Sequence, residues 1–137
     1  MEVKDMLYFS YGSNLNQSQM AIRCPTAKPL GAAYFTGWKL VFKGVADIEI
    51  GEPEDLLPVG IWDIAAWDEA SLDRYEGFPR LYRKEFINGI MTYRMNIGDI
   101  FPPSIDYFNT ILIGYEDFGL DTSALYSALD ESELSVA

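Results

Sequence analysis

Alternating side chains in the middle of the chain constrain its fold more than any other feature. In residues 38–43 and 46–50, apolar side chains occupy every second position and mostly polar ones lie between them. A period of two with one polar face is typical of antiparallel β-strands. Residues 59–64 are nearly all apolar, which indicates a strand buried on both faces. Further strands are expected at residues 6–9, 81–87 and 90–95.

Helical patterns lie between and after these strands. Asp68 and Gly77 bound one expected helix, because Asp favours helix starts and Gly favours helix ends. A second helix is expected where apolar residues recur at i, i+3, i+4 and i+7, namely at Phe108, Ile111, Leu112 and Tyr115. Shorter helices are expected at residues 17–22 and 122–129. This order of elements predicts an α+β fold with a curled or closed, mainly antiparallel sheet.

The length of the chain, 137 residues, is that of one domain. Apolar residues make up 49% of the sequence, which is enough for a sizeable core. No repeat or low-complexity linker divides the chain, so we expect a single domain over residues 1–129. Residues 130–137 are acidic, and we expect this C-terminal tail to fray.

The chain contains no His and a single Cys, Cys24. A histidine general base, a Ser-His-Asp triad and a Cys-His dyad are therefore excluded within one chain. A histidine-based zinc site is excluded as well, and we expect no metal site. An intramolecular disulfide cannot form, so the fold does not depend on an oxidising compartment. Cys24 itself is interpreted as a small buried apolar residue.

The charge of the chain is strongly negative, with 10 Lys and Arg against 21 Asp and Glu and a net charge of -11. Because a phosphate backbone needs a basic surface, we expect no nucleic-acid partner. No apolar run approaches the ~20 residues of a membrane span. Residues 1–5 lack the basic and then apolar pattern of a signal peptide. We therefore expect a soluble, cytoplasmic protein with no membrane partner.

The segment after the first strand is the first candidate for a functional site, and it reads Tyr8-Phe9-Ser10-Tyr11-Gly12-Ser13-Asn14-Leu15. A strand runs here into small turn residues and then into a helix start. Such a turn exposes main-chain N–H groups toward one point, which suits a carboxylate or a developing oxyanion. The alternative is an ordinary capped turn, in which Ser13 or Asn14 is the helix cap.

Glu76 is the second candidate, because it lies at the C-terminal end of its expected helix. A carboxylate there faces the negative end of the helix dipole. The aromatic neighbours Tyr75 and Phe78 can remove it from water, and both effects raise the pKa of Glu76 toward that of a general base. The alternative is an exposed glutamate at a helix end, partly offset by Arg74 or Arg80.

Taken in chain order, these features resemble the gamma-glutamylcyclotransferase-like family, which includes an AIG2-like branch. Residues 8–15 match the N-terminal signature of the family. The apolar strand 59–64 and the helix that ends in Glu76-Gly77 support the match. Tyr82 at the start of the next strand supports it further, as does Pro102-Pro103-Ser104-Ile105-Asp106-Tyr107. The resemblance covers about residues 7–129, although Ser10 stands where many relatives have Ala.

This resemblance implies a small mixed β-barrel with helices outside and a cofactor-independent cyclising reaction. The substrate is a gamma-glutamyl amide whose own α-amine attacks its γ-carbonyl, releasing 5-oxoproline and a free amine or amino acid. Glu76 is implied as the catalytic acid and base. The substrate-binding residues implied by the match are Tyr8, Phe9, Ser10, Tyr11, Gly12, Ser13, Asn14, Leu15, Tyr82 and Tyr107.

Two other functions fit the same sequence. The first is a non-catalytic protein that binds a small ligand in the same pocket, and the second is a structural or interaction domain. An intact Glu76 favours the enzyme. We expect no cofactor and no metal, a small-molecule substrate as the main partner, and a monomer or homodimer.

Overall fold

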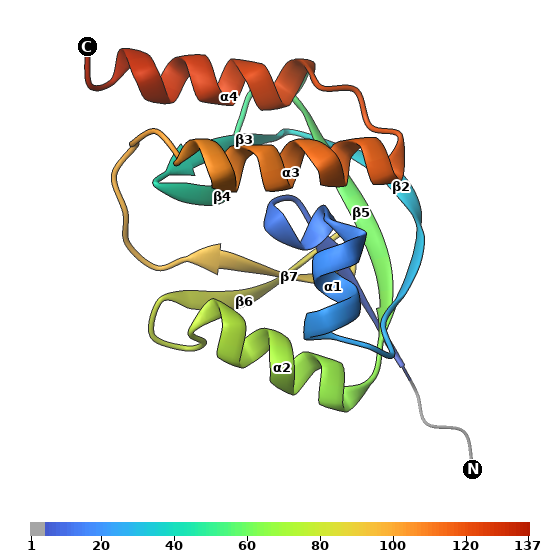
Figure 1. Cartoon of the computed structure of the whole chain (residues 1–137). Coiled ribbons are helices and arrows are strands. Elements are labelled where there is room, and N and C mark those ends of the chain that lie inside the picture. Colours follow the sequence, from blue (N-terminus) through green and yellow to red (C-terminus); the bar gives the residue numbers. More distant parts are fainter. Residues whose placement is uncertain (1–4) are drawn as a thin grey trace.

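The computed structural model describes residues 5–137, and Figure 1 shows the arrangement of its helices and strands. The first half of the chain forms β1 (Met6–Ser10), the short 3-10 helix η1 (Ser13–Leu15), α1 (Gln17–Arg23), β2 (Lys28–Thr36), β3 (Trp38–Lys43), β4 (Val45–Ile50) and β5 (Leu56–Ile64). The second half forms α2 (Ala66–Glu76), β6 (Tyr82–Ile87), β7 (Ile90–Met95), α3 (Ile105–Phe118) and α4 (Ser123–Leu134). The expected α+β class is confirmed.

The strands form a five-stranded sheet and a separate two-stranded hairpin. The order in the larger sheet is β2-β5-β1-β7-β6, and the hairpin is β3-β4. All pairs are antiparallel except β1 with β7, which is parallel. The mainly antiparallel sheet expected from the alternating segments is therefore confirmed, as is the mixed character that the resemblance implied.

The expected closed barrel is wrong, because the sheet stays open at the β3-β4 hairpin. Between β4 and the β6-β7 pair, side chains take the place of a main-chain ladder. The Tyr82 hydroxyl donates to the Ala46 carbonyl at 3.1 Å, and Asp47 accepts from the Met95 N–H at 3.0 Å. Side-chain contacts of this kind join strands without closing the sheet, and periodicity along one strand cannot reveal them.

Two helix boundaries also differ from those expected. Helix α2 begins at Ala66, because Asp68 accepts from the Ala65 N–H at 3.0 Å and so acts one turn inside the helix. Helix α4 continues to Leu134, so the tail expected to fray from residue 130 is helical over most of its length. Two features stabilise this last part of α4. Ser132 is fully buried, and the Glu131 carboxylate pairs with the Lys39 ammonium at 3.1 Å.

Helix α3 covers the loop that follows β1, and α4 lies above α3 (Figure 1). Gly114 makes this close approach possible, because a Cβ atom there would lie 2.6 Å from the Leu15 carbonyl carbon and 2.7 Å from the Asn16 nitrogen. Leu15 is fully buried beneath it in the larger of two core clusters. Packing of α3 therefore fixes the loop between β1 and α1. Among the residues described, no helix is long and apolar enough to span a bilayer.

Candidate active site

A cavity of about 240 Å³ opens where the end of β1, η1, β4, the end of α2, β6, β7 and α3 meet. Most of the residues expected to form the site line it, and they are Tyr8, Tyr11, Gly12, Ser13, Asn14, Glu76, Tyr82 and Tyr107. The structure adds residues that the sequence had not singled out for the site, namely Val45, Ala46, Tyr75, Leu81, Thr92 and Tyr93. Residues from distant parts of the sequence thus converge on one space.

Three residues expected in the site do not line this cavity. Phe9 alternates to the opposite side of β1 from Tyr8 and packs edge-on against Phe35, with ring centroids 5.0 Å apart. The Ser10 hydroxyl accepts a hydrogen bond from the Trp62 indole at 3.0 Å. Leu15 lies in the core under α3. These side chains support the loop from behind, and their contact with a ligand stays a prediction.

Glu76 projects into the cavity from the last residue of α2. Its Oε1 accepts a hydrogen bond from the Asn14 side-chain amide at 3.2 Å. Burial raises the pKa of the Glu76 carboxyl to about 7, and the nearby Arg23 guanidinium opposes this rise. The carboxyl is therefore poised to gain or lose a proton near neutral pH, as its place in the sequence predicted.

The cation that acts on Glu76 is not one of the two expected. Arg74 is exposed and donates to Ser71 on its own helix, and Arg80 is exposed as well. Arg23, at the end of α1, donates to the side-chain oxygen Oδ1 of Asn14. Its guanidinium carbon lies over the Tyr75 ring, 3.6 Å from the ring centroid. Sequence reasoning missed Arg23 because no local pattern connects residue 23 with residues 75 and 76.

Three tyrosines, Tyr11, Tyr82 and Tyr107, line the same cavity as Glu76. The Tyr107 hydroxyl accepts from the Ala46 N–H at 3.0 Å, while Tyr82 donates to the Ala46 carbonyl. Tyr11 donates to the main-chain carbonyl of Tyr93. Burial raises the pKa of each of these three phenols far above neutral pH, so they stay protonated and serve as hydrogen-bonding groups.

The loop of Gly12, Ser13 and Asn14 forms another wall of the cavity. Among the residues that the structure describes, no acceptor lies within hydrogen-bonding distance of the main-chain N–H of Ser13 or Asn14. A Cβ atom on Gly12 would lie 3.0 Å from the Ala46 Cβ, so the absence of a side chain lets the loop approach β4. The turn thus leaves these N–H donors without a partner, and their binding of an anionic group stays a prediction.

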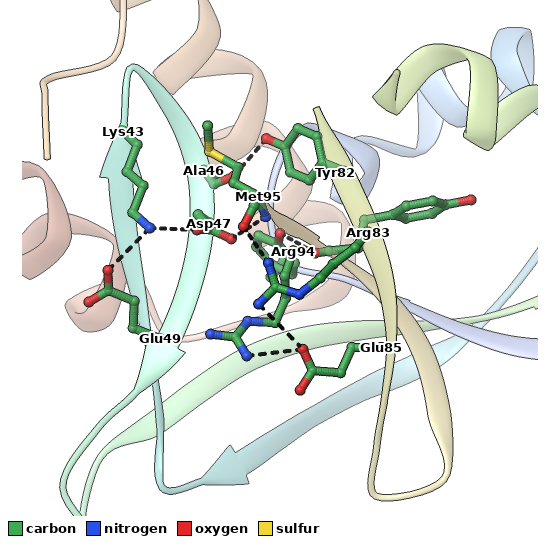
Figure 2. Close-up of polar contacts among 11 residues, drawn as sticks. Lys43, Ala46, Asp47, Glu49, Tyr82, Arg83, Glu85, Arg94 and Met95 are labelled. Carbon is green, nitrogen blue, oxygen red and sulfur yellow. Dashed lines mark hydrogen bonds and ion pairs between the residues drawn. The ribbon is translucent and has the colours of Figure 1, made fainter. Parts of the chain in front are cut away.

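A group of charged residues behind the cavity fastens β4 to its neighbours (Figure 2). Asp47 is buried and accepts from the Lys43 ammonium at 2.8 Å and from the Met95 N–H at 3.0 Å. Lys43 also pairs with Glu49 at 3.2 Å. Figure 2 shows the same strand held to β6 by the Tyr82 hydroxyl, which reaches Ala46. These contacts hold Ala46, which lines the same cavity as Glu76.

Comparisons with known proteins show which solved structures share this fold. No protein-family model matches the chain, and no curated protein sequence matches it. Solved structures with similar folds include the following three. The human protein loc79017 is 25% identical, with a TM-score of 0.75 over 98% of this chain and 88% of that one. A gamma-glutamyl cyclotransferase is 24% identical, with a TM-score of 0.74 over 94% of this chain and 86% of that one.

The third similar structure is YkqA from Bacillus subtilis, which is 21% identical with a TM-score of 0.73. The match covers 92% of this chain and 54% of YkqA, so the chain spans about half the length of that protein. At these identities the likeness concerns the course of the backbone. The resemblance predicted from the sequence is therefore confirmed at the level of the fold, while the AIG2-like branch stays a prediction.

Proposed function

We propose, from the gamma-glutamylcyclotransferase-like fold of this chain, that it is an enzyme that cyclises gamma-glutamyl amides. The products are 5-oxoproline and a free amine or amino acid. One observation carries this proposal: Glu76, with a pKa raised to about 7, shares a small cavity with unpaired main-chain N–H groups of the Ser13-Asn14 turn. Acid and base chemistry on an amide needs a proton carrier and a site for negative charge.

The proposed reaction begins with the α-ammonium group of the substrate, whose ordinary pKa is ~8. Glu76 accepts one proton from it, and the freed amine nitrogen attacks the γ-carbonyl carbon of the same molecule. A C–N bond forms, and the carbonyl oxygen becomes negatively charged. Glu76 then donates its proton to the leaving nitrogen as the original amide bond breaks and the carbonyl double bond re-forms. The ring nitrogen gives up its second proton through Glu76 to the released amine, which leaves as an ammonium, and Glu76 returns to its starting state. Ring closure within one molecule removes much of the entropic barrier.

The walls of the cavity suit the other parts of such a substrate. The N–H groups of Ser13 and Asn14 are available for the α-carboxylate or for the developing oxyanion. Tyr82 and Tyr107 add protonated hydroxyls close to Ala46. A volume of about 240 Å³ is small for a binding site, since drug-sized ligands occupy pockets of ~300–1,000 Å³. One glutamyl group with its leaving group extending outward fits this size.

The test is Glu76→Gln, assayed by 5-oxoproline release from gamma-glutamyl amines, gamma-glutamyl amino acids and glutathione. Loss of general acid and base catalysis is expected to lower kcat by ~10²–10⁴-fold. Glu116→Gln is a matched control, because Glu116 is an exposed glutamate on α3. A variant at residue 76 that keeps the wild-type rate would remove the role proposed for this carboxyl.

Ligand binding without turnover is the other outcome that this experiment can reveal. If the wild-type protein binds a gamma-glutamyl compound tightly and returns it unchanged after long incubation, the cavity serves binding alone. We further propose that the protein acts in the cytoplasm, which is supported by its single cysteine, Cys24, being a buried free thiol.

A further inference from the structure

Arg23 is the last residue of α1 and is held by three contacts. Its Nη1 donates to the side-chain oxygen Oδ1 of Asn14, and its Nη2 donates to the side-chain oxygen of Gln19 at 2.9 Å. The guanidinium carbon lies 3.6 Å from the centre of the Tyr75 ring, which is stacking distance. Tyr75 is tied to the loop as well, because its hydroxyl lies 3.0 Å from the Ser13 hydroxyl. Arg23 therefore joins α1, the loop and the end of α2.

The Asn14 side chain has a partner at each end, and this determines how its amide is oriented. Its carbonyl oxygen accepts from Arg23, so its NH₂ group must face the other way. The two N–H bonds of that group then reach the Tyr8 hydroxyl at 3.1 Å and Glu76 Oε1 at 3.2 Å. Without Arg23, a flipped amide would set its oxygen against the carboxylate, and two acceptors would face each other.

Arg23 also differs in charge from the other groups around Glu76. It is the cation whose field favours the ionised carboxylate, and it opposes the effect of burial on the pKa of Glu76. The other titratable groups coupled to this carboxyl are neutral phenols, whose pKa values the Glu76 charge helps to raise. They come from β1, the following loop, β6, β7 and α3, and they are Tyr8, Tyr11, Tyr82, Tyr93 and Tyr107.

We propose that Arg23 is a positioning residue for Glu76 that acts through Asn14. The guanidinium holds the amide in the one orientation that donates to the carboxylate, and so keeps this carboxylate turned into the cavity. The effect on turnover rests on the function proposed above. The effect on the orientation of Asn14 and on the protonation of Glu76 is a property of the folded protein and holds with or without turnover.

The first experiment compares kcat/KM against pH for the wild type, Arg23→Met and Arg23→Lys. Arg23→Met removes the donor and the charge. Its kcat/KM is expected to fall by ~10-fold, and its acidic limb, near pH 7 in the wild type, is expected to move to higher pH. Arg23→Lys keeps the charge but loses the planar two-point contact and the stacking. It should lose rate with a smaller movement of the limb.

Arg74→Met is the matched control, because Arg74 lies on α2 two residues before Glu76 and is exposed. It should keep the wild-type rate and pH profile. Arg23→Met with an unchanged pH profile, or Arg74→Met with the same shift as Arg23→Met, would overturn the proposal. A purely structural role for Arg23 would lower the amount of folded protein without moving the limb.

Nuclear magnetic resonance tests the same inference without substrate. In Arg23→Met, the side-chain amide signal of Asn14 should move and the ¹³C titration of the Glu76 carboxyl should shift to higher pH. Should Arg23→Met fail to fold, Arg23→Lys is expected to show the amide change alone. If both signals match those of the wild type in a folded variant, Arg23 does not position Glu76. If the wild type shows no cyclising activity, these signals still decide the role of Arg23, while the proposed function fails separately.

Discussion

Two carboxylates, Glu76 in the cavity and Asp47 next to the wall residue Ala46, have very different surroundings. Asp47, on β4, is 2% exposed and is met by the Lys43 ammonium at 2.8 Å and by the Met95 N–H at 3.0 Å (Figure 2). Glu76, at the end of α2, receives one side-chain hydrogen bond from Asn14 at 3.2 Å, and Arg23 bonds to that amide rather than to the carboxylate. One carboxylate is compensated by a direct ion pair and the other is not.

This difference separates a structural carboxylate from a reactive one. A buried carboxylate with a direct counter-ion and a main-chain donor joins the elements that supply these partners, and breaking such a pair is costly. A buried carboxyl with weaker compensation has a raised pKa, so it exchanges protons near neutral pH. The protein thus holds the wall of the cavity with Asp47 and leaves Glu76 available for chemistry. Four substitutions test this distinction.

Asp47→Asn should have the largest effect, because it removes one partner of a buried ion pair. The Lys43 side chain is 12% exposed and would keep only Glu49 as a partner. We expect a loss of ~3 kcal/mol in the free energy of unfolding, measured by urea denaturation. Glu49→Gln is the control, since the Glu49 side chain is 44% exposed, and it should lose less than ~1 kcal/mol. Equal losses would show that Asp47 is not the structural carboxylate.

Gly114→Ala should displace the loop whose Asn14 side chain donates to Glu76, although Gly114 itself does not line the cavity. The added Cβ would lie 2.6 Å from the Leu15 carbonyl carbon, so α3 or the loop that carries Asn14 must move. Overpacking of this kind is expected to lower the free energy of unfolding by ~1–3 kcal/mol and to reduce 5-oxoproline release as well. Asn109→Ala, at an exposed position of α3, should change neither. Full activity in the Gly114 variant would mean that the loop tolerates displacement.

Parts of this arrangement follow from local sequence, and these parts were predicted. The alternation in residues 38–43 and 46–50 predicted the hairpin that carries Asp47, although not its ion pair with Lys43. The small residues at 12–14 predicted a turn with free N–H groups. The position of Glu76 before Gly77 predicted a raised pKa, since helix end and aromatic neighbours are both local.

Other parts depend on contacts between distant residues, which no local pattern encodes. Strand β2 has exposed side chains at most positions and no alternation, so its extended form comes from pairing with β5. Helix α4 continues past residue 129 because Glu131 meets Lys39 from β3. Arg23 joins the site through Tyr75, which lies 52 positions later in the chain. Closure of the barrel failed as a prediction for the same reason.

Glu76→Gln should stabilise the protein at alkaline pH, in contrast to Asp47→Asn. The folded-state pKa of Glu76, about 7, lies above its usual value of 4.5, so folding favours the protonated carboxyl. Its contribution to stability is complete below pH 4.5 and is lost as the pH rises through 7. At pH 8 the neutral glutamine should therefore raise the free energy of unfolding by ~1–2 kcal/mol, measured by thermal unfolding. A gain at pH 4 of the same size would contradict this account.

Tyr82→Phe tests the hydrogen bond to Ala46, the residue that lies next to Asp47 and lines the cavity with Glu76. Of the four substitutions it should have the smallest effect on stability. The variant loses the 3.1 Å hydrogen bond from the Tyr82 hydroxyl to the Ala46 carbonyl, which helps to hold β4 across from Glu76. We expect a loss of ~1 kcal/mol in the free energy of unfolding. Because Ala46 forms the cavity wall, KM for a gamma-glutamyl amide should rise by ~3-fold, which corresponds to less than the energy of one such hydrogen bond.

Tyr34→Phe is the matched control for this last prediction. The Tyr34 hydroxyl accepts from the Asp121 N–H at 2.9 Å, and neither residue lines the cavity. It removes the same chemical group from another tyrosine that bonds to the main chain, so a similar loss of stability is expected. KM should be unchanged in this variant. Equal KM values in the two variants would show that the hydroxyl of Tyr82 supports the fold in general and does not position the cavity wall.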